Sequence, residues 1–173
     1  YLQKNMPEKA EETYKKSIEL APNYSMPYDG LAGIYFSRRE FDKAMNLMET
    51  AISRGNATVE IYNNFGGLAN TMGEYRKTIA VTKESLSKFG NNPLALSNIA
   101  KAYANTGKLD SAFYFAGMIR DKAAKADLES SLYAGAARNA YENKDFNACI
   151  QYSQKAIEIN PGFSYPYVLS GSA

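Results

Sequence analysis

The sequence predicts an all-α solenoid of antiparallel helix pairs, because two kinds of side chain repeat along it with one spacing. Small residues recur every 34 residues, with a single step of 37 at the end: Ala10, Ala44, Thr78, Ala112 and Cys149. The same long step occurs in two aromatic or apolar series: Phe41, Tyr75, Leu109 and Phe146, and Tyr28, Tyr62, Leu96, Tyr133 and Tyr167. A shared period in the range of about 20 to 50 residues indicates duplicated modules that stack on their neighbours.

Each period contains two amphipathic stripes, which predict two helices. In residues 25–58, one stripe has the helical spacing i, i+3, i+4, i+7: Tyr28, Leu31, Ala32 and Tyr35. A second stripe follows: Phe41, Ala44, Met48, Ala51 and Ile52. The polar segment 37–40 separates the two helices, and the corresponding breaks in later units contain Gly73 and Gly107, where a left-handed residue can end a helix.

Prolines delimit the same elements. Pro27, Pro93 and Pro166 lie near the first turns of first helices, and Pro22 and Pro161 follow second helices. We expect a second helix at about 7–20 and a final first helix from about 164, within one solenoid over 1–173. The expected units are the end of a truncated repeat (1–24), four full repeats (25–58, 59–92, 93–126, 130–163) and the start of another (164–173). The three extra residues, at about 127–129, should lengthen a linker or a helix end and disturb the superhelical twist slightly.

Composition excludes several classes of function. The 20 basic and 18 acidic residues leave a net charge of only +2, which argues against nucleic acid as a partner. The sequence has no apolar run long enough to span a membrane and no signal-peptide pattern. A lone Cys149 excludes an internal disulfide and fits a reducing or an oxidising compartment.

Catalysis is not expected. The sequence has no His, which removes the usual activating base for Ser or Cys nucleophiles and the commonest metal ligand. Cys149 occupies a small-residue position and should be buried. No metal or cofactor is expected, and most of the 14 tyrosines are explained as core side chains.

These residues resemble the tetratricopeptide repeat pattern over essentially the whole chain. The pattern has bulky, small and aromatic residues at fixed positions, and the first full unit carries Tyr28, Leu31, Ala32, Tyr35, Phe41, Ala44 and Ala51. The resemblance implies a right-handed superhelix and protein or peptide partners. Because Tyr1 and Ala173 both fall inside helices of the pattern, we expect a fragment of a longer protein that self-associates through its truncated ends.

The resemblance also implies that first helices line a concave groove. Carried over position by position, the peptide-binding candidates are Asp29, Gly33, Phe36, Glu60, Asn63, Asn64, Gly67, Asn70, Asn98, Lys101, Asn105, Arg138 and Tyr141. The cations of the chaperone-type carboxylate clamp are missing in either alignment of the units. Asn64 and Asn98 resemble two rungs of the asparagine ladder of O-linked GlcNAc transferases, with a hydrated polar face as the alternative. On the ladder interpretation, replacing both by Ala weakens peptide binding without lowering stability.

We therefore expect a non-catalytic scaffold that binds a peptide or protein segment in its groove. The alternative is an arm that oligomerises or positions a larger enzyme or membrane-associated protein. A repeat-type RNA reader fits the helix pairs but not the charge balance, and its binding would fall steeply with salt.

Overall fold

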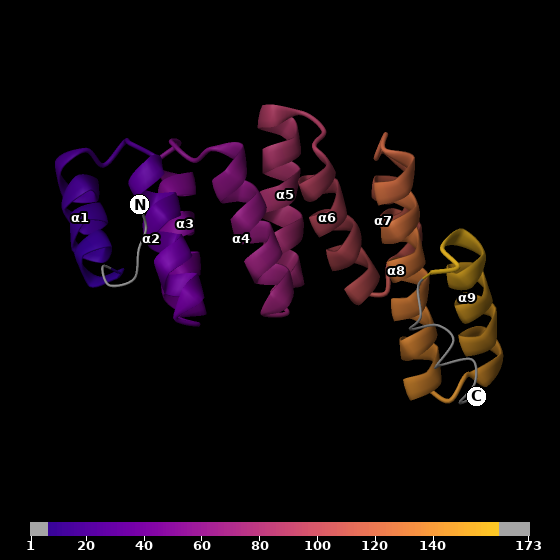
Figure 1. The fold of residues 1–173 in the computed structure, drawn as a ribbon. Coiled ribbons are helices and arrows are strands. Elements are labelled where there is room, and N and C mark those ends of the chain that lie inside the picture. The colour runs from indigo at the N-terminus through magenta and orange to yellow at the C-terminus, as the bar shows by residue number, and fades with distance from the viewer. Residues whose placement is uncertain (1–6, 163–173) are drawn as a thin grey trace.

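The described part of the chain, residues 7–162 of the computed structural model, consists of nine α-helices and no strand (Figure 1). Their bounds are α1 (Pro7–Leu20), α2 (Met26–Ser37), α3 (Phe41–Ser53), α4 (Val59–Thr71), α5 (Tyr75–Phe89), α6 (Pro93–Asn105), α7 (Leu109–Gly117), α8 (Lys122–Glu142) and α9 (Phe146–Ile159). The helix expected from about residue 164, with Pro166 and Tyr167, lies outside the described residues.

Consecutive helices pack side by side along the whole array. α2 contacts α3, α4 contacts α5, α6 contacts α7 and α8 contacts α9, and each second helix also contacts the first helix of the next pair. The connections between paired helices are short, which makes the paired helices antiparallel. The helices therefore follow one another across the molecule as in Figure 1, and the predicted all-α solenoid is confirmed.

The turn inside each pair uses one backbone conformation. Arg39, Gly73, Gly107 and Lys144 occupy the corresponding position of the four units and all have positive φ, at 60°, 78°, 77° and 62°. The next residue then donates its N–H to a carbonyl five residues earlier, as from Glu40 to Tyr35 (2.8 Å). This bond closes the helix end around a left-handed residue. The glycine turns expected at 73 and 107 are confirmed.

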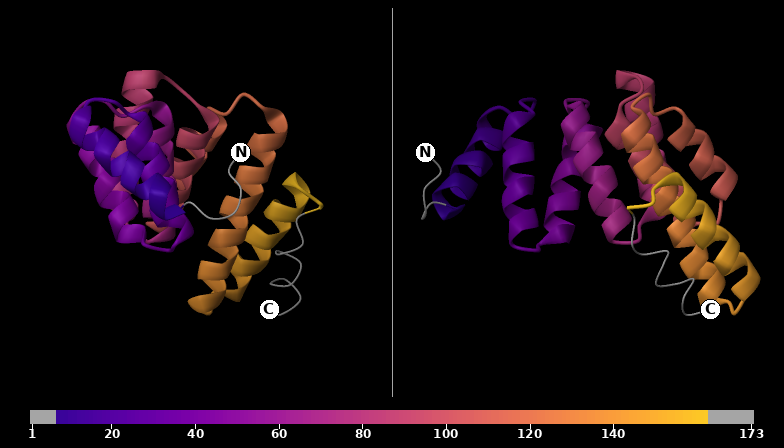
Figure 2. Two further views of the ribbon diagram at one scale, coloured as in Figure 1. Left: turned by 60° about the vertical axis from the view of Figure 1, so that its left-hand side comes forward. Right: turned by 45° about the vertical axis from the view of Figure 1, so that its right-hand side comes forward.

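The structure differs from the expected helices around the three extra residues. α7 already ends at Gly117, and α8 begins at Lys122, so residues 122–129 lengthen the front of α8. The side chain of Asp121 accepts a hydrogen bond from the N–H of Ala124 (2.7 Å) and caps this helix. In Figure 2 the pair α8 and α9 is tilted relative to the helices before it.

The interior follows the repeating pattern. Cys149, Ala44 and Ala112 are each 0% exposed, so the expected burial of Cys149 is confirmed. Tyr28 and Tyr62 are 0% and 1% exposed, and each hydroxyl contacts a cation at the end of the following second helix, Arg54 or Lys88. These tyrosines fill the gaps beside the small residues and link two successive helices.

Candidate functional site

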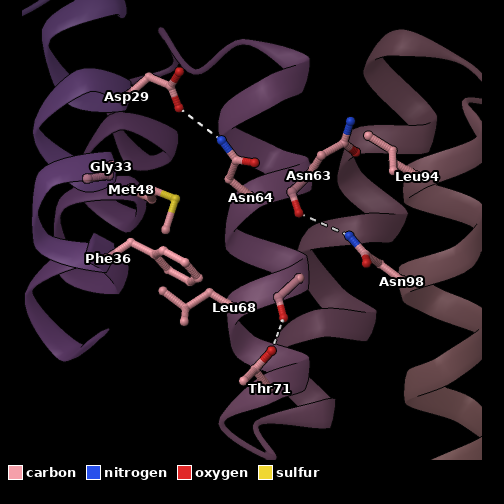
Figure 3. Close-up of a pocket in the computed structure, with 12 residues that line it drawn as sticks. Asp29, Gly33, Phe36, Met48, Asn63, Asn64, Leu68, Thr71, Leu94 and Asn98 are labelled. Atoms are coloured by element: carbon pink, nitrogen blue, oxygen red, sulfur yellow. Dashed lines mark hydrogen bonds between the residues drawn. The ribbon is translucent and has the colours of Figure 1, made fainter. Parts of the chain in front are cut away.

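A hollow on the face of the first helices lies between α2, α4 and α6 and has a volume of about 480 Å³ (Figure 3). We call it the first pocket. Its lining residues are Asp29, Ala32, Gly33 and Phe36 of α2, Met48 of α3, Asn63, Asn64, Gly67, Leu68 and Thr71 of α4, and Leu94 and Asn98 of α6. Seven of the candidate groove residues meet here: Asp29, Gly33, Phe36, Asn63, Asn64, Gly67 and Asn98.

The first pocket combines an apolar floor with apolar side chains that reach solvent. Ala32, Met48 and Leu68 are 4%, 3% and 3% exposed, whereas Phe36 and Leu94 are 54% and 65% exposed. Phe36 extends from α2 towards Leu68 of α4 in Figure 3. Exposed apolar side chains beside a concave apolar surface are typical of interaction sites.

A second pocket of about 290 Å³ follows along the same face, between α4, α6 and α8. Its lining residues are Asn70, Thr71, Lys101, Ala104, Asn105, Ser131, Leu132, Gly135, Ala136, Arg138 and Asn139. Four more candidates meet there: Asn70, Lys101, Asn105 and Arg138. Thr71 lines both pockets, so they are neighbours on this face, and we call the two together the groove.

Two candidate residues line neither pocket. Glu60 lies in the first turn of α4, where its negative charge is favourable. Hydrogen bonds lower the pKa of its carboxyl, first from its own backbone N–H and then from the Thr58 hydroxyl. Tyr141 packs edge-on against Phe146, with ring centroids 5.9 Å apart. The local contacts of these two side chains therefore involve a helix end and a neighbouring ring.

The groove asparagines have intramolecular partners that the sequence did not reveal. Asn64 Nδ2 donates to Asp29 Oδ1 (3.0 Å), and Asn98 Nδ2 donates to the carbonyl of Asn63 (3.0 Å). Both bonds join residues 35 positions apart, so corresponding positions of neighbouring units are linked twice, once through a side-chain carboxylate and once through a backbone carbonyl. Asn70 Nδ2 in turn donates to the carbonyl of Asn98 (2.8 Å). Replacing Asn64 and Asn98 by Ala is therefore now expected to affect stability as well as binding.

Each pocket also contains an amide oxygen without a partner. Within residues 7–162, Asn63 Oδ1 and Asn70 Oδ1 are buried and accept no hydrogen bond, and four further buried polar atoms of this kind lie outside the pockets. A buried acceptor left unpaired costs about 1–3 kcal/mol. A ligand N–H would recover that cost only after the amide side chain turned its oxygen towards the groove.

Sequence reasoning missed the floor of the first pocket. Met48 was interpreted only as core, and Leu68 was not singled out. A usable signal for Leu68 was its spacing, since it lies four residues after Asn64 and therefore on the same face of α4. Met48 belongs to a second helix, and only the separation of α2 and α4 brings it into the groove.

The described residues offer neither a membrane span nor a metal site. Among residues 7–162, no helix is both long and apolar enough to cross a bilayer. Over the same residues, His, Cys, Asp and Glu side chains do not gather in groups of three or more that could bind a metal ion.

The chain was compared with known proteins. A family model described as tetratricopeptide repeat matches residues 1–24 and 130–163. None of the curated proteins compared with the chain matches it significantly. Several solved structures share its fold.

Three of these structures illustrate the likeness. YrrB, described as a TPR protein with an unusual peptide-binding site, has a TM-score of 0.71 at 18% identity, covering 95% of this chain and 84% of that chain. MamA has a TM-score of 0.63 at 14% identity, covering 92% and 97%. PilW, described as a widely conserved type IV pilus biogenesis factor, has a TM-score of 0.61 at 16% identity, covering 94% and 74%. The family match thus identifies tetratricopeptide repeats at residues 1–24 and 130–163, and the helix pairs between them have the fold of these solved structures.

Proposed function

We propose that the chain is a non-catalytic scaffold that binds a peptide or protein segment in the groove formed by α2, α4, α6 and α8. The first pocket carries this proposal, because it offers an apolar floor together with an unpartnered amide oxygen. An apolar side chain of the segment would occupy the space above Met48 and Leu68. A backbone N–H of the segment would pair with Asn63 Oδ1 once that side chain turns its amide towards the groove, since amides can pair with an extended backbone.

Tetratricopeptide repeats in general support protein interaction, and the description of YrrB names a peptide-binding site in that protein. The volume of the first pocket, about 480 Å³, lies within the range of about 300–1,000 Å³ usual for ligand sites. The two pockets are neighbours that share Thr71, which suits a segment lying across several helices rather than a compact small molecule. These points support a protein or peptide partner.

Gly33 provides a direct test, because it lines the first pocket and a Cβ there would meet no atom within 4 Å. Gly33→Leu should fill the pocket without disturbing the fold. Peptides that bind the wild-type protein would be selected from a random 12-residue library. Their affinities for wild type and for Gly33→Leu would then be measured by fluorescence polarisation. Burying one large apolar side chain contributes about 1.5–3 kcal/mol, so the variant should bind about ten- to a hundredfold more weakly.

Gly117→Leu is the matched control. Gly117 is also exposed with no atom within 4 Å of an added Cβ, but it lies at the end of α7 and lines neither pocket. Gly117→Leu should leave the affinity for the selected peptides unchanged. Selected peptides that bind wild type and Gly33→Leu equally well would contradict the proposal. Failure to select any peptide, with a molecular mass that rises with concentration, would favour an assembly arm instead.

A further inference from the structure

The groove has opposite charges in its two pockets. Asp29 is the charged residue among those lining the first pocket, and Lys101 and Arg138 are the charged residues among those lining the second. One side of the groove, at α2, is therefore negative, and the other side, at α6 and α8, is positive.

These three groove charges have no ion-pair partner among the described residues. Asp29 accepts a hydrogen bond from the neutral amide of Asn64, which leaves its charge uncompensated. Because the acid and the bases lie in different pockets, they do not neutralise one another.

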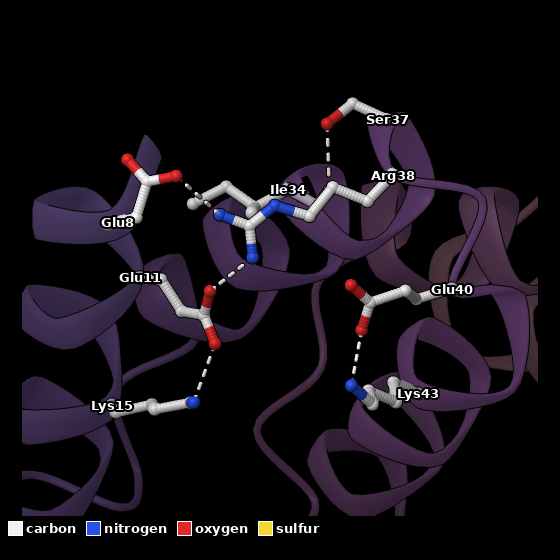
Figure 4. A network of polar contacts seen from close by, with 8 residues as sticks. All are labelled: Glu8, Glu11, Lys15, Ile34, Ser37, Arg38, Glu40 and Lys43. Carbon is white, nitrogen blue, oxygen red and sulfur yellow. Dashed lines mark hydrogen bonds and ion pairs between the residues drawn. The ribbon is translucent and has the colours of Figure 1, made fainter. Parts of the chain in front are cut away.

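Ion pairs do form elsewhere on the protein. Figure 4 shows that Arg38 forms ion pairs with Glu8 and Glu11. Lys15 also pairs with Glu11, and Lys43 pairs with Glu40. Further along the chain, Lys88 pairs with Glu84 (2.7 Å) and Lys125 with Glu129 (3.7 Å). Many other surface charges also lie outside these ion pairs, and the three groove charges differ from them in lining the two pockets with opposite signs. An occupant of opposite charge pattern would pair with all three.

The geometry also sets a minimum length for such an occupant. Packed helices lie about 8–10 Å apart, and α2 lies further than that from α4, so a path across α2, α4, α6 and α8 covers at least about 25–30 Å. An extended chain advances about 3.3 Å per residue, so at least about eight or nine residues are needed for that path. Thr71 belongs to both pockets, so a single segment can run from one to the other.

We infer that the groove binds an extended segment of a protein partner in a fixed order of side chains. A Lys or Arg lies at Asp29, a bulky apolar residue occupies the first pocket, and an Asp or Glu lies at Lys101 and Arg138. This inference rests on the proposed function and adds the chemistry of the partner. The order of charges sets which end of the segment lies at α2.

Nine-residue fluorescent peptides of one composition test this order. One places a basic and an apolar residue at its start and acidic residues at its end, with a neutral spacer between. A second has the reverse sequence, and a third has the same residues with charges interspersed. One of the two ordered peptides should bind at least about fivefold more tightly than the interspersed peptide, and the difference should shrink at high salt.

Variants then assign each charge. Asp29→Asn keeps a side-chain oxygen for Asn64 while removing the charge, and it should abolish the preference for the basic residue. The double variant Lys101→Glu, Arg138→Glu should change the preference at the other end from acidic to basic residues, by about five- to tenfold. Glu49→Lys, an exposed change on α3 outside both pockets, is the charge control and should leave both preferences unchanged.

The outcomes separate the inference from the proposed function. The inference alone would be overturned by two results together. Peptides would lose binding to Gly33→Leu, and wild type, Asp29→Asn and the double variant would all show the same preference for peptide charge. Equal binding of ordered and interspersed peptides would do the same. Peptide binding that is unaffected by Gly33→Leu would overturn the proposal that the groove is the binding site.

Discussion

Gly30 and Gly33 lie three residues apart in α2, and replacing each by alanine should affect stability differently. Alanine is about 0.8–1.0 kcal/mol more favourable than glycine in a helix interior. An added Cβ at Gly33 meets no atom within 4 Å, so Gly33→Ala should gain most of this free energy. An added Cβ at Gly30 would lie 2.5 Å from Cζ of Tyr14 and 2.8 Å from its hydroxyl oxygen.

The clash at Gly30 sets the size of the difference. Overpacking costs about 1–3 kcal/mol, which cancels or exceeds the gain in helix propensity. Gly33→Ala should therefore exceed Gly30→Ala in unfolding free energy by at least about 1 kcal/mol. Urea denaturation followed by far-UV circular dichroism would measure both variants beside the wild type. Equal midpoints for the two variants, or a Gly33→Ala protein less stable than wild type, would refute this reasoning.

Three further predictions follow from the helix turns, the polar contacts and the core. Arg39→Gly should raise the unfolding free energy by about 0.5–1 kcal/mol, because it removes a left-handed non-glycine residue, whereas Gly73→Arg should lower it by a similar amount. Hydrogen bonds, first from Lys88, hold the pKa of Glu84 below its ordinary value. The stability that Glu84 contributes is therefore present above pH 4.5 and is lost as the pH falls through the folded-state pKa. When unfolding free energy is measured against pH, Glu84→Gln should lack this acid-dependent decrease. Cys149, 0% exposed, should react with a thiol reagent only as fast as α8 and α9 open, and a rate equal to that of a free thiol would contradict its packing.

The helix pairs could be predicted because their causes are local. The apolar stripes fix which face of each helix is buried, and Gly73 and Gly107 mark two of the four turns. The turns at Arg39 and Lys144 adopt the same backbone without glycine, so residue identity alone does not reveal them. Their position in the repeat is the only sequence signal.

The start of α8 could have been predicted from local chemistry. Asp121 is a good N-cap residue, and it precedes a run rich in Ala and Lys that favours helix. Fitting the chain to a fixed 34-residue unit placed the start of the next repeat at 130, whereas α8 begins at Lys122, so the extra residues lengthen a helix end, one of the two outcomes expected.

The groove could be predicted only in outline. Residue positions indicated which side chains face it, and most of them line the two pockets. The partners of Asn64 and Asn98 depend on how closely neighbouring units approach, which no single helix determines. The depth of the first pocket depends on the same approach, because α2 and α4 must separate before Met48 can form its floor.

The hydrogen bonds from the side-chain amides of Asn64 and Asn98 also link neighbouring units of the array. They join the units on the groove face, so the reach of a carboxamide side chain sets how far that face can open. A glutamine at 64 or 98, one methylene longer, would change the superhelical pitch while keeping the same chemical groups. We therefore expect the curvature of the solenoid, and with it the shape of the groove, to respond to changes at these two side chains.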